Sequence, residues 1–93
     1  MDSEDEILPL LSKDQTGYKS WIVNTMAMWL DSPADEINPD HHFVDCALDS
    51  VSALRLLGMM EIIMDQPFEP TIFAKYPSPT LLAEHLSELA ELV

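Results

Sequence analysis

Residues 50–64 read SVSALRLLGMMEIIM, and ten of these fifteen side chains are apolar. The pattern is helical, and either Asp49 or Ser50 can serve as the N-cap, because both side chains can accept a hydrogen bond from an unpaired N–H of the first turn. One face of a helix cannot hold ten apolar side chains. This helix is therefore either central in a bundle and covered on several sides, or it leaves an apolar strip for a partner.

Upstream, residues 17–30 carry a second helical pattern. Large apolar side chains recur there at i, i+4, i+8 and i+11, which places them on one face of a helix. These side chains are Tyr18, Ile22, Met26 and Trp29, widened by Trp21 and Met28. We expect all six in the core. The helix should end before Pro33, because the residue preceding a proline is pushed out of the α region.

Between these two helices, residues 31–48 form a loop that is long for a compact domain. Single apolar side chains are spaced through it, so that the polar backbone can stay near water while these side chains reach the core. The expected anchors are Ile37, Phe43, Val44 and Leu48.

Downstream, residues 71–76 have room for one or two helical turns, and residues 79–92 form the last helix. Ser78 is its expected N-cap, and Pro79 suits the first helical position, where a missing N–H costs nothing. Its apolar stripe consists of Leu82, Leu86, Leu89 and Val93, and its solvent face of Glu84, Glu88 and Glu91. The sequence thus predicts an all-α fold, a small four-helix bundle with three main helices, one short helix and a long first loop.

The length and charge of the chain limit its organisation and its partners. Ninety-three residues suffice for one small domain, which we place at residues 17–93, after a flexible acidic N-terminal tail at residues 1–16. The formal net charge of −13 argues against binding to nucleic acids or to anionic membranes. Cys46 is the only cysteine and cannot form an internal disulfide. No apolar run is long enough to span a bilayer, and the acidic N-terminus is unlike a signal peptide. We expect a cytoplasmic protein, and a monomer.

Few residues have the setting that catalysis or metal binding requires. His41, His42 and Cys46 are of the types that bind zinc, but a structural zinc site uses four ligands at paired spacings. No serine stands in the glycine-flanked elbow of a serine hydrolase. We therefore expect neither a metal site nor an enzyme.

Ser50 stands out by its position at the start of the helix and at the end of the acidic loop. Unpaired N–H groups and the positive end of the helix dipole make a helix N-terminus a good place for a phosphate. A phosphodiester on Ser50 would be favoured there. The alternative from position alone is a plain N-cap serine.

The stretch Asp45-Cys46-Ala47-Leu48-Asp49-Ser50-Val51 resembles the signature of acyl carrier proteins and carrier domains, which is a glycine, a variable residue, Asp, Ser and a branched aliphatic residue. Three further segments resemble the same family in the same order. They are Ile37-Asn38-Pro39-Asp40 followed by Phe43, then Ala53-Leu54-Arg55-Leu56, and then Tyr76-Pro77-Ser78-Pro79 with Leu82, Ala83 and Leu86. The likeness covers about residues 18 to 92.

This resemblance implies that Ser50 bears a 4′-phosphopantetheine arm, transferred from coenzyme A by a phosphopantetheinyl transferase. The arm would hold acyl groups as thioesters and present them to other enzymes, namely an acyl-loading enzyme and a downstream synthase or transferase. Asp49 would orient the serine or the metal ion of the transferase. Val51, Arg55 and Met59 are the candidates for partner contact, whereas Leu54 is expected in the core.

Two departures from the family pattern concern Ala47, which replaces the motif glycine, and the helix after Ser50, whose only acid is Glu61 beside the basic Arg55. The acid before the serine favours a discrete acyl carrier, similar to carriers found beside fatty acyl-AMP ligases and in polyketide or lipopeptide pathways. Two alternatives remain. One is a peptidyl carrier of a nonribosomal pathway, and the other is a helical protein-interaction module without a prosthetic group, which the apolar, methionine-rich helix would suit.

Overall fold

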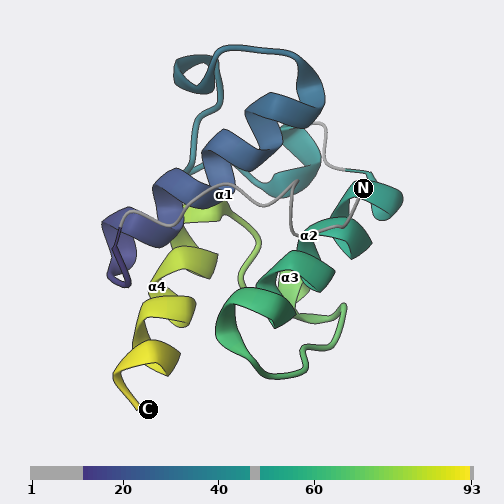
Figure 1. Ribbon diagram of the computed structural model, residues 1–93. Helices are drawn as coiled ribbons and strands as arrows, with labels where there is room; N and C mark the ends of the chain where they lie inside the picture. The colour runs from purple at the N-terminus through teal and green to yellow at the C-terminus, as the bar shows by residue number, and fades with distance from the viewer. Residues whose placement is uncertain (1–11, 47–48, 93) are drawn as a thin grey trace.

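The computed structural model describes residues 12–46 and 49–92, and within these ranges it contains helices and no strand. The elements in chain order are α1 (Gln15–Leu30), η2 (Ala34–Glu36), η3 (Phe43–Cys46), α2 (Ser50–Met64), α3 (Ile72–Lys75) and α4 (Pro79–Glu91). The prediction of three main helices and one short helix is confirmed. Helices α1 and α4 pack against each other, and α2 lies beside them (Figure 1).

Helix α1 begins two residues earlier than the sequence pattern predicts. The reason is Asp14, whose Oδ1 accepts a hydrogen bond from the Gly17 N–H at 2.8 Å and so caps the first turn. The helix ends at Leu30, where Asp31 takes the left-handed conformation with φ 53° and donates its N–H to the carbonyls of the last turn. The predicted tail at residues 1–16 thus includes the cap and first residues of α1, and its residues 1–11 lie outside the described part of the chain.

The core is formed by the inner faces of the three long helices, with side chains from the loops closing it. Its buried members are Tyr18, Trp21, Ile22, Met26, Ala27, Ile37, Phe43, Leu56, Leu57, Met59, Met60, Ile72, Leu82, Ala83 and Leu86. The expectation was wrong for Met28, which is 46 % exposed because it projects from the side of α1 opposite Met26. Trp29 and Leu89 are only partly buried against the core.

The long first loop contains the short helices η2 and η3 and is tied to the start of α4. The Phe43 N–H donates to the Pro77 carbonyl at 2.7 Å, and the Thr80 N–H donates to the Pro39 carbonyl at 2.9 Å. The Thr80 hydroxyl adds a hydrogen bond to Asp40 Oδ1 at 2.8 Å. Ile37 and Phe43 are buried as predicted. The other two expected anchors, the Val44 side chain and Leu48, lie outside what is described, as does Val93.

Helix α4 begins as its sequence predicts. The Ser78 hydroxyl accepts a hydrogen bond from the Leu81 N–H at 3.2 Å, and Pro79 occupies the first turn. Leu82 and Leu86 are buried, whereas Glu84, Glu88 and Glu91 are exposed. None of the helices in the described ranges combines the length and the apolar character that crossing a membrane requires.

Candidate functional site

Asp49 and Ser50 form the start of α2, and their roles there differ. Asp49 is the N-cap: its Oδ1 accepts a hydrogen bond from the Ser52 N–H at 2.8 Å, and its carbonyl accepts one from the Ala53 N–H at 2.9 Å. Ser50 is the first helical residue, and its side chain is exposed. Of the two caps that the sequence allows, Asp49 is therefore the one used. The hydroxyl of Ser50 is left for other chemistry at the protein surface.

The electrostatics at this helix start favour an ionised Asp49. The hydrogen bond from the Ser52 backbone, followed by one from the Ser52 side chain, lowers the pKa of this carboxyl below its ordinary value of 3.8. The carboxylate thus carries its negative charge at neutral pH beside Ser50 and the positive end of the helix dipole. A phosphate on Ser50 would share the first turn with this carboxylate. Ala47 and Leu48, which precede the pair, lie outside the described residues.

Apolar side chains along one side of α2 are exposed to solvent. Val51, Leu54 and Ile62 are 75 %, 56 % and 49 % exposed. At 100° per residue these positions, together with Arg55 and Gly58, fall within about a third of the helix circumference. We call these five residues the α2 stripe. The ten apolar residues of α2 are therefore divided between two surfaces, because some of them cover the core and others form an exposed apolar strip.

The structure corrects two predictions about α2. Met59, a candidate for partner contact, is only 4 % exposed, because it lies about a quarter of a turn away from Val51 and faces the core. Leu54, expected in the core, belongs instead to the α2 stripe. Helical spacing counted from Val51 places Leu54, Gly58 and Ile62 on the same side of α2, and this spacing is the signal in the sequence that distinguishes Leu54 from the core residues.

Arg55, another candidate for partner contact, is exposed and connects α2 to α1. Its guanidinium carbon lies 4.9 Å from the centre of the Trp29 ring, which is a cation–π geometry. No pattern in the sequence signals this contact, because 26 positions separate the two residues. The contact fixes the stem of Arg55 across the end of α1, so that the α2 stripe is bordered by the partly buried Trp29.

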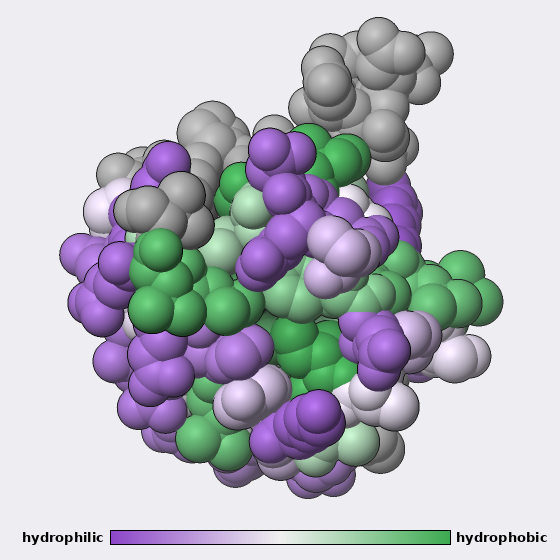
Figure 2. Space-filling view, turned by 90° about the horizontal axis from the view of Figure 1, so that it is seen from below, coloured by the Kyte–Doolittle hydropathy of each residue, from purple (hydrophilic) through white to green (hydrophobic). Residues whose placement is uncertain are grey.

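Apolar side chains are also exposed outside α2. Viewed from below, hydrophobic side chains appear in several patches with hydrophilic ones between them (Figure 2). The exposed large apolar side chains outside α2 are Met28, Leu30, Leu81 and Leu92. Among the described residues, no three His, Cys, Asp or Glu side chains are grouped so that they could hold a metal ion.

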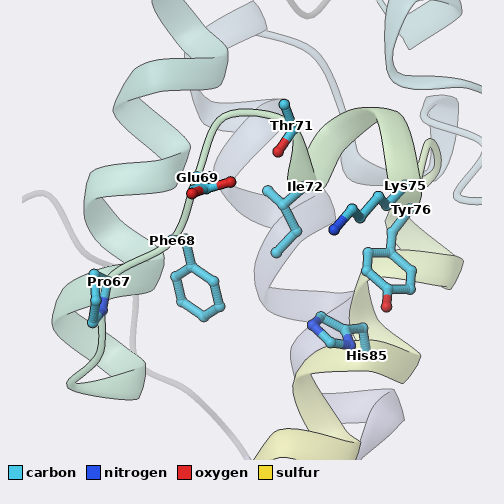
Figure 3. A pocket seen from close by; sticks show the side chains of 8 residues that line it. All are labelled: Pro67, Phe68, Glu69, Thr71, Ile72, Lys75, Tyr76 and His85. Carbon is cyan, nitrogen blue, oxygen red and sulfur yellow. The ribbon is translucent and has the colours of Figure 1, made fainter.

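A pocket of about 240 Å³ lies near the opposite end of α2 from Ser50 (Figure 3). It is lined by Pro67, Phe68, Glu69, Thr71, Ile72, Lys75, Tyr76 and His85. The rings of Tyr76 and His85 stack with their centres 4.1 Å apart. The loop that forms one wall is held to α2, because Glu61 Oε2 accepts a hydrogen bond from the Phe68 N–H at 2.9 Å. None of the five predicted site residues lines this pocket.

Comparison with known proteins places these features in a family context. Residues 20–86, which include Asp49 and Ser50, match the family model described as phosphopantetheine attachment site. A free-standing peptidyl carrier protein from an uncharacterized secondary metabolic pathway of Acinetobacter baumannii superposes with a TM-score of 0.77 at 32 % identity, covering 88 % of this chain and 100 % of that one. Asl1650, an acyl carrier protein from Anabaena sp. PCC 7120 with a variant phosphopantetheinylation-site sequence, superposes with a TM-score of 0.76 at 32 % identity, covering 82 % of this chain and 86 % of that one.

Two curated sequences are similar over a shorter stretch. They are the phenolphthiocerol synthesis polyketide synthase Pks15/1 of Mycobacterium bovis and the putative inactive phenolphthiocerol synthesis polyketide synthase Pks1 of Mycobacterium tuberculosis. Each is 29 % identical to this chain over 55 residues, which is 59 % of the chain. The chain spans only 3 % of the length of either protein.

Proposed function

This chain belongs to the family of phosphopantetheine-binding carrier proteins, and we propose that Ser50 is the residue that bears its phosphopantetheine arm. The observation that carries this assignment is exposure. Of the five serines within the matched residues 20–86, Ser50 alone is exposed. The others, all half-buried or buried, are Ser20, Ser32, Ser52 and Ser78.

The roles of the neighbouring residues support Ser50. Asp49 provides the N-cap of α2, so the Ser50 hydroxyl is not needed to complete the helix and can be modified without loss of a cap. The buried Ser78, by contrast, caps α4 with its hydroxyl. Asp49 is ionised and adjoins the serine in sequence, and we propose that its carboxylate orients either the hydroxyl or a metal ion brought by the modifying enzyme.

The arm, once attached, supplies a terminal thiol that carries cargo as a thioester. The protein itself then contributes three things: an exposed attachment point, a rigid helix behind it, and a surface by which enzymes recognise it. We propose that the cargo is an acyl group of a polyketide, lipopeptide or fatty-acyl pathway, loaded by a fatty acyl-AMP ligase or an acyltransferase. The similarity to polyketide synthases and to an acyl carrier protein supports this proposal.

Intact-mass measurement tests the attachment residue. The protein is incubated with coenzyme A and a broad-specificity phosphopantetheinyl transferase, alongside Ser50→Ala and the matched control Ser52→Ala. We expect the wild type and Ser52→Ala to gain the mass of one phosphopantetheinyl group and Ser50→Ala to gain none. An equal gain on Ser50→Ala would overturn the assignment, and no gain on the wild type would leave the interaction module without prosthetic group as the better reading.

A peptidyl cargo is the second candidate, because the similar Acinetobacter protein is described as a peptidyl carrier. The protein that bears the phosphopantetheine arm but no cargo distinguishes an acyl carrier from a peptidyl carrier. It is offered a fatty acid with ATP and an acyl-AMP ligase, malonyl-coenzyme A with a malonyl transferase, or an amino acid with ATP and an adenylating enzyme. Thioester formation with either acyl donor supports an acyl carrier, and the ligase and the transferase distinguish a starter from an extension unit. Acceptance of the amino acid alone would favour a peptidyl carrier.

A further inference from the structure

Three side-chain donors of the pocket near the end of α2 are not used by the fold. They are the Lys75 ammonium, the Tyr76 hydroxyl and the His85 imidazole, and all three residues line the cavity. In the described part of the chain, none of these groups makes an ion pair or a side-chain hydrogen bond. Polar groups that converge on one cavity without such a partner are available to a ligand.

The surrounding structure holds these donors in place. The rings of Tyr76 and His85 stack with their centres 4.1 Å apart and 12° between their planes, and both side chains are half-buried. Each ring therefore restricts the orientation of the other. Lys75, the last residue of α3, extends toward Ile72, and the two rings lie below its ammonium (Figure 3). A ligand would thus meet prearranged donors, which lowers the entropy cost of binding.

The other side of the pocket is apolar. Ile72 is 6 % exposed, and Phe68 packs against the core. The hydrogen bond from the Phe68 N–H to Glu61 fixes this wall without a ligand. The cavity of about 240 Å³ is smaller than the pockets that hold drug-sized molecules. It therefore suits a small molecule with a compact apolar body and a polar end.

The charges of the lining residues set the charge of that polar end. Lys75 carries one positive charge, and the Glu69 carboxylate lies on the far side of Ile72 from it (Figure 3). A second negative charge on the ligand would meet Glu69. One carboxylate has enough lone pairs to accept from all three donors, since the His85 imidazole has an N–H in either charge state. The pocket thus favours a monoanion over a dianion.

We propose that this pocket is a binding site for a small monocarboxylic acid with an apolar body. Its carboxylate accepts hydrogen bonds from Lys75, Tyr76 and His85, and its apolar body packs against Phe68 and Ile72. The site goes beyond the proposed function, because it lies at the opposite end of α2 from Ser50. Its ligand is a free molecule, so that binding does not require the arm.

NMR titration of the isotope-labelled full chain tests the site. Benzoate and hexanoate, an aromatic and an aliphatic monocarboxylate, are added at about 0.15 M salt, which screens the net charge of −13. Benzyl alcohol is the uncharged control, and phosphate is an anion without an apolar body. The variants are Lys75→Met, Tyr76→Phe, which keeps the aromatic ring, and the matched control Lys13→Met, which removes the same charge at an exposed position outside the pocket. The amide spectrum of each variant shows whether it is folded.

Saturable shifts of the amides of residues 67–76 with benzoate or hexanoate support the site, and the tighter of the two identifies an aromatic or an aliphatic body. Lys75→Met and Tyr76→Phe should each raise Kd about tenfold or more, because each removes a hydrogen bond to a charged group. Lys13→Met should leave Kd unchanged. Absence of saturable shifts with both carboxylates overturns the proposal, as does equal binding of benzyl alcohol or phosphate, or an unchanged Kd in Lys75→Met. The mass measurement decides the Ser50 assignment separately.

Discussion

Met59 and Leu54 are both apolar residues of α2, and replacing each by alanine should have opposite consequences. Met59 is 4 % exposed, so Met59→Ala removes three heavy atoms from the core and leaves a cavity. The lost burial of a methionine is about 1.5 to 3 kcal/mol, and with the cavity the loss of folding free energy becomes about 2 to 5 kcal/mol. A domain of 93 residues has a total stability of only about 5 to 14 kcal/mol.

The corresponding fall in Tm is at least about 8 °C, since each kcal/mol shifts the Tm of a domain of this size by about 4 to 8 °C. Leu54 is 56 % exposed, and Leu54→Ala should change the unfolding free energy by no more than about 0.5 kcal/mol. For phosphopantetheinyl transfer the order of the two variants should be reversed, with Leu54→Ala having the larger effect. Leu54→Ala should raise the KM of the transferase reaction, whereas Met59→Ala should leave it near the wild-type value below the melting transition.

Urea unfolding followed by circular dichroism measures the first effect, and transferase kinetics measure the second. The m-value should be unchanged in both variants, so that a shift of the midpoint reports stability alone. Equal destabilisation by the two substitutions would refute the assignment of Met59 to the core and Leu54 to the surface. A neutral Met59→Ala would do the same.

Glu61→Ala should destabilise the protein by about 1 kcal/mol, because the Phe68 N–H loses its acceptor, and Glu61→Gln should recover most of this in urea unfolding. The pKa of Asp49 lies below 3.8 in the folded protein, so its ionised form contributes stability above that pH, and the contribution is lost as the pH falls through the folded pKa. Asp49→Asn should therefore remove this part of the pH dependence of the folding stability. Titration of the Ser52 amide resonance between pH 2 and 6 should show the low pKa of Asp49 directly in the wild type, and the variant should show no such titration step. Because the chain has a net charge of −13, raising salt from low to about 0.5 M should slow association with a basic partner more than it speeds dissociation in stopped-flow measurements; association rates that do not change with salt would contradict electrostatic steering.

Local signals account for the parts of the structure that the sequence predicts well. Ser78 and Pro79 mark the start of α4 because cap and first-turn preferences act within a few residues. The bounds of α2 at residues 50 and 64 follow in the same way from Asp49 and from the apolar run. The prediction of a carrier protein depended on a short motif with supporting segments, and the family match confirms it. The assignment of the arm to Ser50 remains a prediction.

Features that join distant residues were not accessible in this way. Trp29 lies under Arg55, and Thr80 bonds to Asp40, because the folded chain brings these pairs together across 26 and 40 positions. Hydrogen-bond and cation–π partners at such separations produce no repeating pattern in the sequence from which they could be predicted. The same is true of the pocket near Tyr76 and His85, whose walls come from three segments of the chain.

The sequence by itself determined that the chain is helical, where its long helices lie, and that Ser50 stands at the start of one of them. Helix propensity, capping and periodicity depend on neighbours within about four residues, so they can be read along the chain. Only the tertiary structure decided which side of α2 faces water. Ten apolar residues allow more than one orientation of that helix, and the packing of α2 into the bundle selects the one that buries Met59 and exposes Leu54.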